Sequence, residues 1–114
     1  MRVALFRAFP RTYHIADAGN NAVRKLDGAT GVLSTVAGVL GSRGSAGDGG
    51  PGTAAQLNYP EGLARDAATG DLYIADSASH AVRKLDGATK VLSTVAGVLG
   101  KPGSAGDEIG RAHV

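Results

Sequence analysis

The segment "AVRKLDGATGVLSTVAGVLG" at residues 22–41 returns at residues 81–100 as "AVRKLDGATKVLSTVAGVLG", with a single substitution. The similarity extends further, because residues 15–48 and 74–107 are identical at 27 of 34 positions at an offset of 59. A repeat of this length is typical of arrays in which each unit buries its apolar surface against a neighbour. The chain is therefore predicted to contain two copies of one structural unit.

Each copy is predicted to form four short β-strands. The strands expected in the second copy are "EGLARD" (61–66), "DLYIAD" (71–76), "AVRKLD" (81–86) and "VLSTVAG" (91–97). Their turns of three or four residues contain Gly, Ser or Thr, which favours an antiparallel meander. In the first copy, "YHIAD" (13–17) begins the last three strands, and "RVALFRA" (2–8) is apolar enough to be the innermost strand. Helical periodicity is limited to about one turn, "TAAQLN" (53–58). The fold class is all-β, and a repeated four-stranded sheet is the blade of a β-propeller.

The composition narrows the functional classes. The 114 residues carry a net charge of +2 with no Lys/Arg run longer than two, so no basic surface indicates nucleic-acid binding. There is no cysteine, which excludes disulfides and thiolate metal sites. No apolar run approaches the length of a membrane-spanning helix, so no membrane partner is expected.

The repeat resembles a known family. "HIADAGNNAVRKLD" (14–27) and "LYIADSASHAVRKLD" (72–86) resemble the NHL repeat, in which an Ala-Asp strand, a polar turn and an Arg-Lys strand follow one another. "GSAGDGGPGTAAQLNYPEGLARD" (44–66) is similar to the longer versions of that repeat. The resemblance covers residues 13–107. It implies two tandem four-stranded antiparallel blades of a six-bladed β-propeller that binds protein or RNA, sometimes beside a catalytic domain.

The repeat stops near both ends of the chain. We divide the chain into a non-repeat N-terminal segment with a candidate strand (1–12), a first blade with a glycine-rich loop (13–59), a second blade (60–107) and a non-repeat tail (108–114). Since two blades do not close a propeller, we expect a piece of a longer array. Atypical capping segments are the alternative.

Two acid–base pairs recur in the repeat. Asp17 with Arg24, and Asp76 with Arg83, lie on consecutive strands around a four-residue turn. In an antiparallel pair the arginine is the diagonal neighbour of the aspartate and lies within reach of it. A ligand-binding charge pair is one interpretation, and a structural hairpin brace is the other. Recurrence in both copies favours the brace.

The sequence also predicts a ligand-binding face. In a meander, the turns 18–21 and 77–80 emerge on the same side as the glycine-rich connection between the blades. The two copies differ chiefly in these turns, and variable loops often carry function. The candidate ligand-binding residues are Asn20, Asn21, Ser79 and His80.

Signatures of catalysis or of cofactor binding are weak. "GDGGPG" (47–52) fits Gly-x-Gly-x-x-Gly, but only about one helical turn follows, so no dinucleotide is expected. The histidines at 14, 80 and 113 are too scattered to form a zinc site. We therefore expect no metal, no cofactor and no catalytic residue.

Three functional hypotheses follow. The first is a non-enzymatic interaction scaffold whose partner is a protein or additional blades, with RNA less supported. The second is part of the propeller domain of an enzyme whose catalytic residues lie in other blades. The third is a subunit of a homotrimeric propeller, because three copies of two blades make six.

Overall fold

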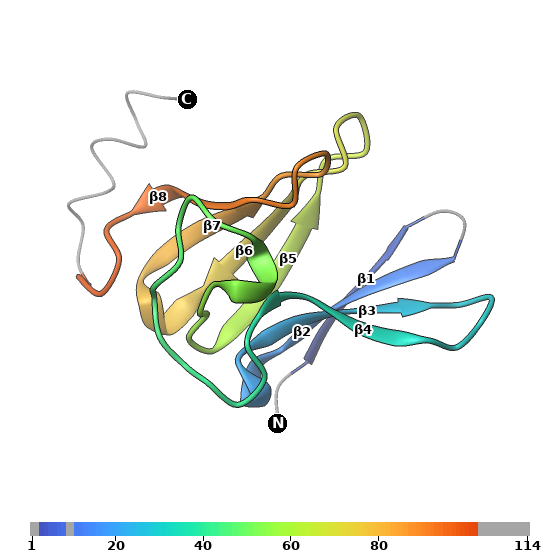
Figure 1. The fold of residues 1–114 in the computed structure, drawn as a ribbon, viewed down its shortest axis with the longest axis horizontal. Coiled ribbons are helices and arrows are strands. Elements are labelled where there is room, and N and C mark those ends of the chain that lie inside the picture. Colours follow the sequence, from blue (N-terminus) through green and yellow to red (C-terminus); the bar gives the residue numbers. More distant parts are fainter. Residues whose placement is uncertain (1–2, 9–10, 103–114) are drawn as a thin grey trace.

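The computed structural model describes residues 3–8 and 11–102. In these residues, eight strands form two sheets with the orders β1-β2-β3-β4 and β5-β6-β7-β8, and all neighbouring strands are antiparallel. The first sheet consists of β1 (Val3–Ala8), β2 (Thr12–Asp17), β3 (Ala22–Asp27) and β4 (Leu33–Gly38). The second consists of β5 (Pro60–Arg65), β6 (Leu72–Asp76), β7 (Ala81–Leu85) and β8 (Leu92–Gly97). The chain is therefore all-β, with one meander following the other (Figure 1).

The first strand comes from a segment that lacks the repeat. β1 pairs with β2 in a continuous register from Val3 opposite Asp17 to Ala8 opposite Thr12. Its counterpart β5 has a different sequence and pairs with β6 in the same way, apart from an irregularity near Pro60. Strand pairing uses backbone groups that every residue except proline provides, so the two sheets share a topology without sharing this strand's sequence.

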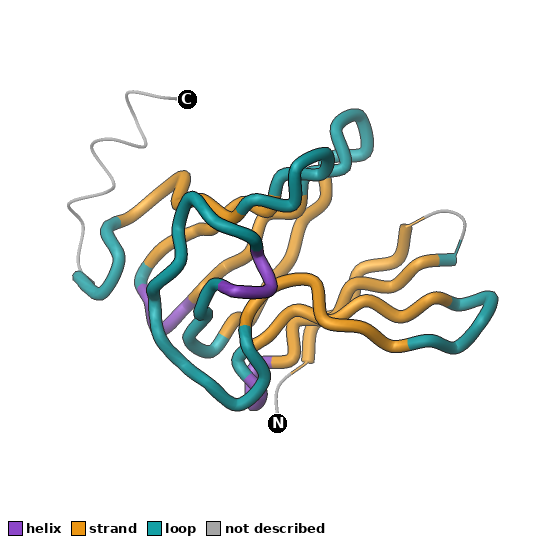
Figure 2. The backbone as a smooth tube through the Cα atoms, in the orientation of Figure 1, coloured by secondary structure: helices purple, strands orange, loops and turns teal. Residues whose placement is uncertain are grey.

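Within the described part of the chain, three one-turn 3-10 helices lie in the connections (Figure 2). The helices η1 (Ala18–Asn20) and η3 (Ser77–Ser79) occupy the equivalent turns between the second and third strands of each sheet. Each ends at a residue in the left-handed region, Asn21 or His80. The third helix, η2 (Gly52–Ala54), overlaps the candidate turn "TAAQLN" (53–58) only at Thr53 and Ala54. Among the described residues, none of these helices has the length and apolar character to span a membrane.

The two sheets share one core. We call residues 39–59, which connect the sheets, the glycine loop; Figure 1 draws most of it in green. Buried apolar side chains come from the first sheet, from this loop and from the second sheet. They are Val23 and Ala37, then Ala55 and Leu57, then Leu72, Ile74, Leu85 and Leu92. The innermost strands β1 and β5 also contact each other. The glycine loop is thus part of the packing between the sheets.

Candidate functional site

Arg83 lies at the centre of a buried polar cluster. Its Nη1 donates to Asp76 Oδ2 at 2.9 Å, and both side chains have no exposed surface. The same nitrogen donates to the carbonyl of Gln56 at 3.1 Å. Its Nε and Nη2 donate to Asp48 Oδ1 at 3.2 and 2.6 Å, and the Thr94 hydroxyl donates to Asp48 Oδ2 at 2.5 Å. A buried charge needs partners of this kind, and here every nitrogen of the guanidinium has one.

The local sequence explains why Arg83 reaches this position. Asp76 is directly opposite Ala81 in the β6–β7 register, so Arg83 is its diagonal neighbour. A register shift between Val82 and Arg83 follows on the β8 side, and it sets Arg83 opposite Thr94. The hairpin therefore places Arg83 beside Asp76, while Asp48 arrives from the glycine loop of the first unit.

The equivalent pair in the first sheet is looser. Arg24 Nη1 lies 3.6 Å from Asp17 Oδ2, and their side chains are 18% and 11% exposed. Asp17 Oδ2 also accepts a hydrogen bond from the Asn20 amide at 2.9 Å. Among the described residues, the buried atoms Asp17 Oδ1 and Arg24 Nε have no hydrogen-bond partner. The same two residue types thus have different surroundings in the two sheets.

Sequence reasoning missed Asp48. From the sequence this residue stands out only as part of "GDGGPG" (47–52), and its role in holding Arg83 was not predicted. A signal exists, because Asp48 recurs as Asp107 at the repeat offset although it lies in a loop. An acid that recurs at the same offset as the Asp–Arg pair of the repeat is the sequence signal that could have identified Asp48 as a structural residue.

The predicted ligand-binding face gathers the turns 18–21 and 77–80 with both ends of the glycine loop. The Gly41 N–H donates to the Asn20 carbonyl, and the Tyr59 N–H donates to Asn21 Oδ1, both at 2.9 Å. In the second sheet the Gly100 N–H donates to the Ser79 carbonyl at 2.9 Å. We call this end of the two sheets the loop face.

The four candidate residues on the loop face differ in environment. Asn20 and His80 are exposed. Asn21 is half-buried and holds the Tyr59 backbone, whereas Ser79 is buried. The structure thus leaves Asn20 and His80 exposed to solvent and packs Asn21 and Ser79 within the turns.

The opposite end of the sheets is built from aspartate-capped turns. Asp27 Oδ1 accepts hydrogen bonds from the backbone N–H groups of Ala29 and Thr30. Asp86 makes the same two contacts in the second sheet. These backbone N–H groups favour the ionised carboxylate and lower the pKa of Asp27 and of Asp86 below the usual value. This end is a structural turn in both copies.

His14 lines a cleft between the two sheets, together with Lys25, Asp86 and Lys90. Burial lowers the pKa of His14 below its usual value, and Arg65 with the two lysines lowers it further. Among the described residues, no group of three His, Cys, Asp or Glu side chains is arranged to hold a metal ion. The histidine is thus placed among cations in this cleft.

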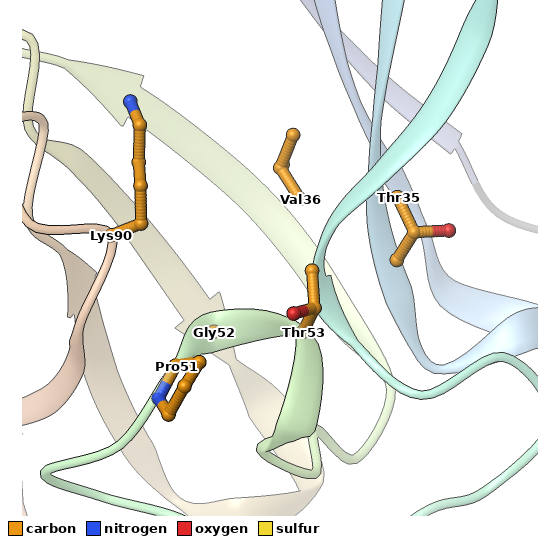
Figure 3. Close-up of a pocket in the computed structure, with 6 residues that line it drawn as sticks. All are labelled: Thr35, Val36, Pro51, Gly52, Thr53 and Lys90. Carbon is orange, nitrogen blue, oxygen red and sulfur yellow. The ribbon is translucent and has the colours of Figure 1, made fainter.

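A further cleft lies where β4 faces the β7–β8 turn (Figure 3). It is lined mostly by apolar surface. The lining residues are Thr35, Val36, Pro51, Gly52, Thr53 and Lys90. Gly52 N–H donates to the Lys90 carbonyl at 2.9 Å, so the glycine loop closes one side of the cleft.

Comparison with solved structures supports the architecture. A Bacteroides thetaiotaomicron protein of unknown function matches 87% of this chain with a TM-score of 0.76 and 24% identity. An auxiliary nutrient binding protein from the same organism matches 83% with a TM-score of 0.64 and 18% identity. A third protein from this organism, provisionally named a phosphatase, matches 82% with a TM-score of 0.62 and 20% identity. At these identities the likeness concerns the fold alone.

The chain spans about a quarter of the length of these proteins, namely 24%, 25% and 22%. No curated protein matches the chain. The family model of the NHL repeat matches residues 57–85, which include β5, β6 and β7. The chain thus carries an NHL repeat, centred on the first three strands of its second sheet.

Proposed function

We propose that this chain forms two blades of a six-bladed β-propeller and acts as a non-enzymatic scaffold whose loop face binds a protein partner. Three features support the proposal: the two consecutive meanders, the NHL repeat and the surface of the loop face. The charged cluster around Arg83 supports a structural role rather than catalysis, because its buried donors and acceptors satisfy one another.

The observation that carries the binding proposal is a set of exposed apolar side chains on the loop face. Val39, Leu40, Tyr59 and Val98 are all exposed large hydrophobic residues. They adjoin the turns that contain Asn20 and His80. The Gly41 N–H donates to the Asn20 carbonyl, and the Gly100 N–H donates to the Ser79 carbonyl. Exposed apolar side chains gathered beside polar ones are typical of protein-binding surfaces.

Tyr59 is well suited to act as an anchor. Its backbone has a positive φ of 57° and is fixed by the hydrogen bond to Asn21 Oδ1. An aromatic side chain on a fixed backbone loses little conformational entropy on binding. The repeated strands thus provide the scaffold, while the loops between them present the contact residues.

A random peptide library displayed on phage tests the loop face. Peptides enriched on the wild-type chain are expected to contain apolar anchors and to lose about tenfold or more in affinity for Leu40→Ser and Tyr59→Ala. The matched control is Val32→Ser, which changes an exposed apolar residue at the opposite end of the first sheet. Peptides that bind both loop-face variants as tightly as the wild type would refute the proposal.

A further inference from the structure

Two side chains that depart from the repeat meet in one cleft. Lys90 stands where the first copy has Gly31, and it is the single difference between residues 22–41 and their second copy. On β2, His14 stands where the second copy has Tyr73. Lys90 and His14 line the same cleft between the two sheets, and described residues form both of its walls. This cleft, which we call the His14 cleft, therefore has a composition that the repeat alone would not produce.

Lys90 brings its ammonium to the cleft from a strained backbone position. Its φ is 62°, close to the 75° of Gly31 at the equivalent turn position. Glycine adopts this left-handed conformation without strain, whereas a residue with a Cβ does so at a cost in free energy. The Lys90 side chain extends away from Pro51 and Gly52 (Figure 3), and its Nζ donates to the Gly87 carbonyl at 2.8 Å. An ammonium has three donors, so it can bind a further acceptor in the cleft.

Three cations surround His14 in the cleft. Lys25 is directly opposite His14 in the β2–β3 register, and Lys90 lines the facing wall. The Arg65 guanidinium lies beside Gly70, another lining residue, because a Cβ placed on Gly70 would be 3.8 Å from Arg65 Nη2. Within residues 3–8 and 11–102, none of the three cations forms an ion pair with an acid. Their charge is therefore available to a ligand.

The carboxylates near the cleft stabilise its turns. Asp86, which also lines the cleft, accepts hydrogen bonds through Oδ1 from two backbone N–H groups of its own turn, at 2.8 and 2.9 Å. Asp71 accepts a hydrogen bond from the Gly87 N–H at 2.7 Å and lies 3.9 Å from the Lys84 ammonium. Three unpaired cations thus lie beside two carboxylates that are already engaged, so the cleft has an excess of positive charge.

The size of the cleft and one ring nitrogen limit what can bind there. The volume is about 90 Å³, several times the ~10–15 Å³ that one water molecule requires and below the ~300–1,000 Å³ of pockets for organic ligands. His14 Nδ1 is buried and has no hydrogen-bond partner among the described residues. Since an unpartnered buried polar atom costs free energy, an oxygen atom bound in the cleft would offset that cost. A small, oxygen-rich anion meets both conditions.

We propose that the His14 cleft binds one tetrahedral oxyanion, either free phosphate or the phosphate group of a monoester. The residues that bind it are His14, Lys25, Arg65 and Lys90. The phosphate oxygens accept charge-assisted hydrogen bonds from the three cations. The imidazole turns its unpartnered Nδ1 to the anion and donates to it when protonated. Because the binding residues come from both sheets, the bound anion joins one sheet to the other, at the end opposite the loop face.

An NMR titration of the chain with inorganic phosphate tests the site. Potassium chloride keeps the ionic strength constant, so general screening does not contribute. Saturable amide shifts are expected at Gly70 and Gly87, which line the cleft, and not at Gly41 on the loop face. Glycerol 3-phosphate distinguishes the two sources: saturation by both ligands assigns the site to a phosphate group, and saturation by the inorganic ion alone assigns it to free phosphate. No saturable shift with either ligand would overturn the proposal.

Single variants test the two lysines. Lys25→Gln and Lys90→Gly are each expected to weaken phosphate binding about fivefold or more. Lys25 is exposed, and Lys90→Gly introduces the residue of the first copy at a position of positive φ, so both variants are expected to fold. The matched control Lys101→Gln removes the same charge from an exposed site near the loop face and is expected to leave binding unchanged. Equal affinities of Lys25→Gln and Lys101→Gln, or a wild-type affinity in Lys90→Gly, would contradict the site.

The pH dependence of sulfate binding tests the part of His14. Sulfate keeps its charge between about pH 7.5 and pH 5.5, and so do the charged groups around the ring, namely Lys25, Arg65, Asp86 and Lys90. Burial and the cations lower the pKa of His14 in the free chain, and a bound anion raises it, so binding takes up a proton. Sulfate affinity is therefore expected to rise about threefold or more as the pH falls through this range. His14→Tyr, which introduces the residue of the second copy, is expected to abolish the rise, and a wild-type affinity independent of pH would remove His14 from the site.

Discussion

Arg83 and Asp48 are separated by 35 residues in sequence, yet the guanidinium donates to the carboxylate at 2.6 Å. This contact fastens the loop that leaves the first sheet onto the face of the second. Asp76 binds the same guanidinium from within the hairpin. One arginine thus links the internal structure of a unit to the packing between units.

Arg83→Gln is expected to destabilise the fold strongly. The substitution leaves Asp76, which has no exposed surface, without its cationic partner, and the expected loss is about 3–5 kcal/mol in the free energy of unfolding. The matched control is Lys84→Gln on the same strand. Lys84 lies 3.9 Å from Asp71 at a partly exposed site, so its loss is expected to stay below about 1 kcal/mol. Urea denaturation measures both values, and equal losses would contradict the buried-pair account.

Asp48→Asn is expected to loosen the glycine loop while the sheets remain folded. The Asp48 side chain is partly exposed, so the expected cost is about 1–2 kcal/mol. Amide hydrogen exchange is expected to accelerate at Gly49, which donates to the Leu92 carbonyl at 2.8 Å. The Gly31 amide, which bonds to Asp27 in the first sheet, serves as the internal control. Uniform acceleration at both amides would indicate global destabilisation instead.

Gly38→Ala is expected to cost more than Gly41→Ala. Both glycines have positive φ, +85° and +75°, so alanine is strained at either position by about 1–2 kcal/mol. A Cβ at Gly38 would also lie 2.5 Å from the Asn21 carbonyl and press on Leu57, whereas a Cβ at Gly41 would meet nothing within 4 Å. We expect a difference of at least about 1 kcal/mol in thermal or urea unfolding. Similar losses would show that the backbone relaxes around Asn21.

Stability is expected to fall as the pH drops below about 6.5, because of His14. Its pKa is lower in the folded state, chiefly through burial. As the pH falls, the unfolded chain is therefore protonated first and is stabilised relative to the folded chain. The contribution of His14 to the free energy of unfolding is constant above the unfolded-state pKa of histidine and is lost as the pH falls towards the lower folded-state pKa. His14→Tyr, which introduces the residue found at the equivalent position 73, removes this dependence. Urea denaturation of both proteins at several pH values between about pH 7.5 and pH 5 gives the free energy of unfolding against pH. Parallel curves for the wild type and His14→Tyr would contradict the prediction.

The strands of the repeat could be located from the sequence. "DLYIAD" and "AVRKLD" contain β6 and β7, because alternating apolar residues bounded by turn residues have few other compact arrangements. The diagonal placement of Arg83 beside Asp76 also followed from the length of the turn. These features depend on contacts between residues close in sequence. Local patterns carry enough information to position them.

Asp48 and the shared core required the tertiary structure. The hydrogen bonds of Asp48 to Arg83, and the burial of Leu57 between the sheets, join segments that no local pattern connects. β1 likewise forms without the repeat, since its pairing with β2 uses the backbone. The sequence alone therefore predicts the hairpins better than the contacts that hold the two units together.

The segment "AVRKLDGAT" stands unchanged in both sheets, and it determined by itself that each copy forms the same hairpin. It could not determine that Arg83 would be buried and Arg24 partly exposed. That difference was decided by the tertiary structure, because exposure depends on what packs against a strand. The second sheet receives the glycine loop of the first, whereas the described residues place no such loop on the first sheet.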